Sequence, residues 1–147
     1  MPRLWLAVLG AAAVIGCGDD SSGGGPNQFF PDVAGTYVVE GVFDGVDPTK
    51  ASLAGTVTIE QESLESSILG GTANLTLTDT TGTFALSDTE LDEASVTLAG
   101  IVEFTASNAG ATASWTFTGE RAGDVLEGQH TLTRGASSVS GDWSGER

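Results

Sequence analysis

One thiol is the most reactive side chain in this sequence. Cys17 is the single cysteine, so it has no disulfide partner within the chain and must be free, joined to another molecule or modified. It directly follows Val14-Ile15-Gly16 and an apolar stretch, 4–15, that begins after a short basic start. That stretch is shorter than the ~20 apolar residues of a membrane-spanning helix, and its layout predicts a secretory signal peptide.

The run Val14-Ile15-Gly16-Cys17 resembles the lipobox of bacterial lipoproteins. The resemblance implies that residues 1–16 are a signal peptide, that cleavage occurs before Cys17, and that the thiol is lipidated. Residues 17–28 then form a lipidated cysteine and a flexible linker rich in Gly, Ser and Asp. In this family an Asp after the cysteine commonly marks retention at the inner membrane. Gly18 stands there instead, so we expect lipid anchoring in the bacterial cell envelope, at the outer membrane.

Polar groups on the inward face of predicted strands are candidates for ligand binding, because such groups are costly to bury unpaired. Arg121, His130 and Arg134 have this inward parity. The simplest expectation is that they reach a barrel mouth and meet water or carboxylates such as Glu127 or Glu103. The sharper hypothesis is that His130 and one arginine orient a ligand beside aromatic rings. The predicted ligand-binding residues are Tyr37, Trp115, Arg121, His130 and Trp143.

Catalysis and metal binding have little support. His130 is the single histidine, and no Gly-x-Ser-x-Gly turn between a strand and a helix accompanies it. A hydrolase using His130 is therefore kept only as an alternative, with no enzyme activity, cofactor or metal site expected. Two acidic turns, the carboxylates at 87–93 and the pair Asp44 and Asp47, lack the spacing of a calcium loop, so we expect solvated turns there. We expect Asp19 and Asp20 in the linker to be solubilising charge.

The charge balance excludes one class of partner. Twenty acidic residues against five basic ones give a formal net charge of −15, and removal of residues 1–16 would take away Arg3 and no acid. Such a surface repels phosphate backbones, so we expect no nucleic-acid binding. The same charge suits a soluble, exposed domain.

Alternating apolar residues from position 35 onward predict short antiparallel strands separated by Gly, Asp and Ser turns. We expect strands at 35–43, 53–61, 73–78, around Phe84 and Leu86, 94–106, 112–121, 125–134 and 139–145. The acidic stretch 87–93 is predicted to be a loop. The fifth strand would place Val96, Leu98, Val102 and Phe104 on one face, and the eighth would point Val139 and Trp143 inward.

Eight strands without a helix predict an all-β domain, 29–147, whose sheet closes into an up-and-down antiparallel barrel, because closure removes exposed edges. A β-sandwich is the alternative fold. The strand number and Gly35-Thr36-Tyr37 resemble avidin and lipocalin barrels, in which Gly-x-Trp commonly opens the first strand. This resemblance carries no ligand with it.

The predicted interior carries many large rings, which favours a filled core. These are Tyr37, Phe43, Phe84, Phe104, Trp115, Phe117 and Trp143. Glycines in register with them, Gly119 and Gly145 among others, either receive the rings or leave a cavity. We therefore expect a monomeric, noncatalytic envelope lipoprotein with a binding or structural barrel, whose partner is a small apolar ligand or an envelope protein. The alternative is a carrier of a small apolar or aromatic ligand in the barrel mouth.

Overall fold

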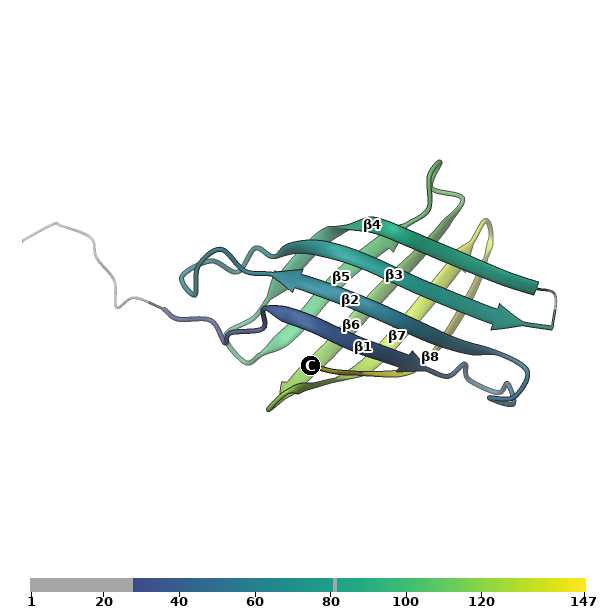
Figure 1. Cartoon of the computed structure of the whole chain (residues 1–147), viewed down its shortest axis with the longest axis horizontal. Coiled ribbons are helices and arrows are strands. Elements are labelled where there is room, and N and C mark those ends of the chain that lie inside the picture. Colours follow the sequence, from purple (N-terminus) through teal and green to yellow (C-terminus); the bar gives the residue numbers. More distant parts are fainter. Residues whose placement is uncertain (1–27, 81) are drawn as a thin grey trace, which may run out of the picture.

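The domain is a closed antiparallel barrel. A computed structural model describes residues 28–80 and 82–147, and in it every strand pairs with its neighbours in sequence while β8 closes onto β1 (Figure 1). The strands are β1 (Gly35–Gly41), β2 (Ser52–Glu60), β3 (Gly70–Asp79), β4 (Gly82–Val96), β5 (Ile101–Ser107), β6 (Ala113–Ala122), β7 (Val125–Arg134) and β8 (Ser137–Glu146). The predicted eight-stranded up-and-down barrel is confirmed, and the sandwich alternative is not the fold. The predicted signal peptide, Cys17 and most of the linker lie outside the described residues.

The period-two pattern accounts for the strands. In β6, Trp115, Phe117 and Gly119 are buried while Thr116 and Thr118 between them face outward, as expected for side chains on alternate faces of a sheet. Outward hydroxyls pair across neighbouring strands, with oxygen–oxygen distances of 3.0 Å for Thr36 and Thr58 and 2.9 Å for Thr131 and Ser140. Such cross-strand pairs stabilise the wall where it meets solvent.

The predicted boundary between the fourth and fifth strands is wrong. The acidic stretch 87–93 belongs to β4, and the chain turns at Thr97–Gly100, inside the strand predicted at 94–106. Leu98 is therefore 51% exposed in the turn instead of inward. The carboxylates are tolerated in β4 because its exposed positions leave them in water.

The interior is packed with rings. Phe104 and Phe117 stack with centroids 4.8 Å apart, and Trp143 meets Phe117 edge-on at 5.3 Å. A Cβ at Gly119 would lie 2.7 Å from the Trp143 ring, and one at Gly145 would lie 3.2 Å from both that ring and Tyr37. The inward glycines thus make room for the rings, so the expected filled core is present here.

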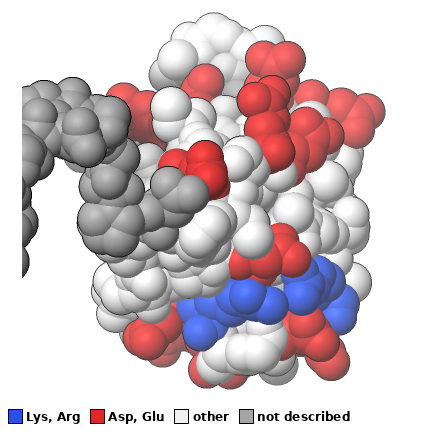
Figure 2. All heavy atoms as spheres, turned by 90° about the vertical axis from the view of Figure 1, so that its left-hand side faces the viewer, with Lys and Arg blue, Asp and Glu red and all other residues white. Residues whose placement is uncertain are grey.

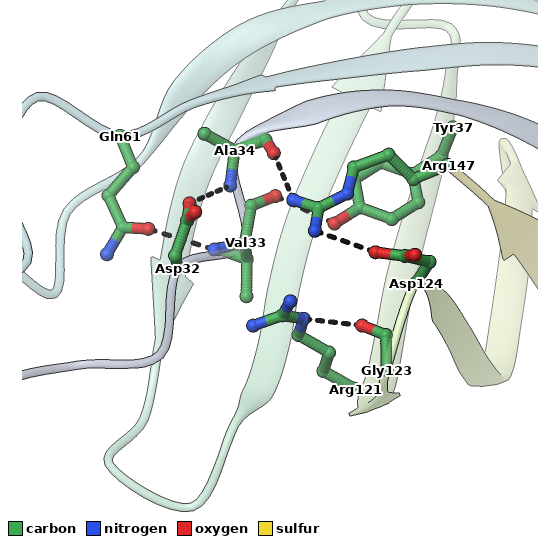
Figure 3. A network of polar contacts seen from close by, with 9 residues as sticks. All are labelled: Asp32, Val33, Ala34, Tyr37, Gln61, Arg121, Gly123, Asp124 and Arg147. Carbon is green, nitrogen blue, oxygen red and sulfur yellow. Dashed lines mark hydrogen bonds and ion pairs between the residues drawn. The ribbon is translucent and has the colours of Figure 1, made fainter.

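One end of the barrel is closed by the segment before β1, and we call it the linker end (left in Figure 1). Val33 is fully buried; its N–H donates to Gln61 Oε1 at 3.0 Å and its carbonyl accepts from the Tyr37 hydroxyl at 2.9 Å (Figure 3). Arg147 donates to the Ala34 carbonyl at 2.7 Å and to the Asp124 carboxylate at 2.8 Å. Figure 2 shows this end, where basic side chains lie beside acidic ones.

We call the opposite end the mouth end. It carries the connection 42–51 between β1 and β2, the turn between β3 and β4, and the connections 108–112 and 135–136. In Figure 1 the β1–β2 connection and the end of β3 lie on the right, away from the entry of the chain.

Candidate ligand-binding mouth

A hollow of about 480 Å³ lies at the mouth end. Its lining comes from β3, β7, β8 and the connection 42–51, and consists of Phe43, Val46, Lys50, Ala51, Leu77, Asp79, Thr80, Leu132, Arg134, Ser137 and Val139. The volume falls within the range of about 300–1,000 Å³ that is usual for small-molecule sites. The mouth is therefore the candidate binding site.

The apolar floor of this hollow is the last inward layer of the barrel. Leu77, Leu132 and Phe43 are each at most 5% exposed, because they continue the inward parity of the core to the ends of their segments. Phe43 is held against the His130 ring edge-on, with centroids 4.9 Å apart. Val139 also keeps the predicted inward parity, yet it is 48% exposed because it lies at the rim.

Arg134, at the end of β7, contacts both an aromatic ring and a carboxylate at the mouth. Its guanidinium carbon lies 5.1 Å from the centroid of the Phe84 ring, and Nη1 is 3.7 Å from Asp79 Oδ2. Its Nε is buried without a hydrogen-bond partner among the described residues. A second hollow, of about 300 Å³, lies on its other side and is lined by Phe84, Asp79 and Thr112, among others. The predicted position of Arg134 at a mouth is confirmed, but its carboxylate neighbour is Asp79, not Glu127 or Glu103.

The residues predicted to bind ligand do not gather at this mouth. Tyr37 belongs to the linker end, and Arg121 lies there too, its Nε donating to the Gly123 carbonyl at 2.8 Å. Trp143 is buried, and its Nε1 donates to the Thr118 carbonyl at 3.2 Å. Trp115 is buried with Nε1 unpartnered among the described residues, and it contacts Phe84 at 5.9 Å between centroids.

His130 is a core residue. Its side chain is 1% exposed, Nε2 lies 2.8 Å from the Val42 carbonyl oxygen, and the ring stacks on Phe117 at 5.9 Å. Burial lowers the pKa of His130, and the hydrogen bond to Val42 only partly opposes this effect. The neutral ring with a proton on Nε2 fits this site, since a carbonyl oxygen can only accept.

This burial predicts a pH dependence of stability. The folded pKa lies below the unfolded value of about 6.5, so the unfolded chain binds more protons and stability falls as the pH drops below that value. Between pH 7.5 and 5.5 the loss for one such histidine is at most about 1.4 kcal/mol. Urea unfolding at the two pH values measures it. His130→Gln, which can still donate to Val42 but does not titrate, should remove most of the difference, and an unchanged difference would assign it to other groups.

The acidic clusters offer no metal centre in the described residues. Asp88, Glu90, Asp92 and Glu93 are all exposed along β4, and no group of three or more His, Cys, Asp or Glu side chains within 28–80 and 82–147 is arranged to hold an ion. The Asp47 carboxylate instead accepts from the backbone and the hydroxyl of Thr49, which lowers its pKa. No helix among these residues is long and apolar enough to cross a membrane.

Comparison with known proteins leaves the site to be argued from its own geometry. Neither protein-family models nor curated proteins nor solved structures give a significant match to this chain.

Three residues of the mouth were not predicted from the sequence: Lys50, Phe43 and Leu132. For Phe43 and Leu132 the inward parity near the end of a strand was the available signal, whereas Lys50 lies in a connection where parity gives no direction.

Proposed function

We propose that this chain is a lipid-anchored, noncatalytic lipoprotein of the bacterial envelope whose barrel binds a small ligand at its mouth. The observation that carries the proposal is the difference between the two ends. The segment that enters the barrel closes one end, with Val33 fully buried there, and the hollow with its apolar floor lies at the other.

This arrangement suits a domain held from its N-terminal side. The chain reaches the barrel at the linker end, so an anchor at Cys17 would be attached to the end opposite the mouth (Figure 1). The linker predicted at 17–28 would let the domain stand away from the membrane, because Gly- and Ser-rich segments behave as flexible coils. The mouth would then be accessible to a ligand or to a partner protein in the envelope.

The surroundings of His130 support the noncatalytic part of the proposal. A general base must come within hydrogen-bond reach of a substrate proton, and this ring is enclosed by Phe43, Phe117 and the Val42 carbonyl. A hydrolase using His130 is therefore the less favoured alternative. A structural module without a ligand is the second candidate, favoured by the packed interior of rings.

Substitution of Cys17 tests the anchor. Cys17→Ser in the full chain should abolish labelling by radioactive fatty acid and move the protein from the membrane fraction to the soluble fraction, because the change removes the thiol that would carry the lipid. Ser22→Ala, in the same predicted linker, is the matched control and should still label. If Cys17→Ser stays entirely in the membrane fraction, another attachment holds the protein.

A further inference from the structure

We infer that the mouth takes a small monoanion with an apolar body, such as an aromatic or aliphatic carboxylate, whose charged head lies at Arg134 and Lys50. This inference deepens the proposed function and rests on it. It assigns a chemical class to the hollow and a role to two cations of the mouth end.

The shape and lining of the hollow select an apolar body. Phe43, Leu77 and Leu132 form a buried floor, and Val46 and Val139 at the rim are 39% and 48% exposed. An apolar ligand that covers these partly exposed side chains removes apolar surface from water, which lowers the free energy of the complex. The hollow is open to solvent on its rim side, so a ligand can enter without disrupting the packed rings of the core.

The charges at the rim select an anionic head. The described residues carry four basic side chains in a strongly acidic chain; Arg121 and Arg147 are at the linker end, and Lys50 and Arg134 line this hollow. The Arg134 guanidinium lies over the Phe84 ring, and its contact with Asp79, at 3.7 Å, is longer than a hydrogen bond. A guanidinium has five N–H donors, so a carboxylate can be bound while Asp79 stays in place.

The acidity of the whole chain limits the charge of the ligand. With a formal net charge of −15, the protein's field opposes the approach of multiply charged anions such as phosphates. Lys50, Arg134 and Asp79 together give the lining of the hollow a formal charge of +1, which a single carboxylate matches.

Three probes with one apolar body test the charge preference. Naphthalene-1-acetate, naphthalene-1-acetamide and 1-naphthylmethylammonium would be titrated calorimetrically into the full chain carrying Cys17→Ser, without detergent. We expect the carboxylate to bind about tenfold more tightly than the amide, because a hydrogen bond between a guanidinium and a carboxylate is stronger than one to a neutral amide. The ammonium should bind most weakly.

Variants locate the head group. Arg134→Gln should weaken carboxylate binding about tenfold and amide binding less than twofold, and Lys50→Gln should act in the same direction with a smaller change. Arg134→Lys keeps the charge and should recover part of the loss, which also covers the case in which Arg134→Gln does not fold. Arg147→Gln removes one positive charge at the linker end and is the matched control, expected to leave both affinities unchanged. Arg121→Gln tests the site predicted from the sequence instead.

The outcomes separate the inference from the proposed function. If the carboxylate and the amide bind equally, or if Arg134→Gln weakens both alike, the mouth binds ligands without recognising a negative charge. This inference is then overturned. If Arg121→Gln causes the loss instead, the site predicted from sequence is the correct one and the mouth assignment fails. If none of the probes binds, ligand binding at the mouth is contradicted, and the structural module becomes the better function.

Discussion

Replacing Phe117 by alanine should lower the free energy of unfolding by about 3–5 kcal/mol, the usual range for truncating a buried phenylalanine. Phe117 is fully buried at the centre of the ring cluster, with centroid distances of 4.8 Å to Phe104, 5.3 Å to Trp143 and 5.9 Å to His130. Its loss removes contacts on several sides at once. The surrounding rings come from different strands of a closed wall, so they cannot easily collapse into the space.

Urea unfolding followed by tryptophan fluorescence and by circular dichroism measures this loss. Thr118→Ala is the matched control, because residue 118 is the next position in β6 and faces outward; its effect should stay within about 0.5 kcal/mol. A loss below about 1 kcal/mol for Phe117→Ala would mean that the interior is loosely packed, and the filled core described above would be wrong.

Gly55→Ala should strongly destabilise the fold, although it adds only one methyl group. Gly55 pairs with Leu75 of β3 at a φ of +153°, and an added Cβ would overlap the carbonyl oxygen of Asn74. The obstacle is backbone, so it cannot rotate away. Overpacking costs about 1–3 kcal/mol and a strained backbone conformation adds about 1–3 kcal/mol, so we expect a loss of about 3 kcal/mol or more.

Gly45→Ala separates the two causes of this loss. Gly45 has a φ of +72° in the connection between β1 and β2, and an added Cβ there would meet nothing within 4 Å. Its loss in the urea unfolding experiment should therefore reflect backbone strain alone, about 1 kcal/mol. Equal losses for the two variants would show that the close approach of β2 and β3 at Gly55 is not rigid.

The inward faces could be predicted from sequence because they obey a simple period. Val57, Leu75 and Phe117 alternate with polar residues and are all buried, since a strand that covers a core on one side must bury every second residue. The same alternation explains why the turn at 97–100 was not predicted. Leu98 continues the apolar parity from Val96 to Val102, so the pattern runs through a turn whose signal is Gly100, with a φ of +85°.

The acidic segment 87–93 was predicted to be a loop because it is rich in Asp and Glu, whereas it forms part of β4. Asp and Glu are poor strand formers on average, but at exposed strand positions their carboxylates stay hydrated and no charge is buried. Asp88 is also fixed across the sheet, with its N–H donating to Asn74 Oδ1 at 2.9 Å. Such a pairing between β3 and β4 depends on register, which a single sequence does not supply.

The mouth could be predicted only in part. The inward parity of Arg134 near a strand end indicated a position at a barrel mouth, and this is where it lies. The hollow itself requires Lys50, Leu77 and Val139 to converge from separate parts of the chain, and that convergence follows from barrel closure. Tyr and Trp are common in binding sites, but the Tyr37 hydroxyl and the Trp143 Nε1–H each donate to a backbone carbonyl of the protein.

The order of strand pairing bears on how the domain folds. In the part of the chain that the structure describes, seven of the eight pairings join strands consecutive in sequence, and β1 with β8 is the exception. Neighbouring hairpins form with little loss of loop entropy, whereas the seam between β1 and β8 must bring distant segments together. The seam is therefore expected to form after the folding transition state, so that weakening it would speed unfolding and leave the folding rate nearly unchanged.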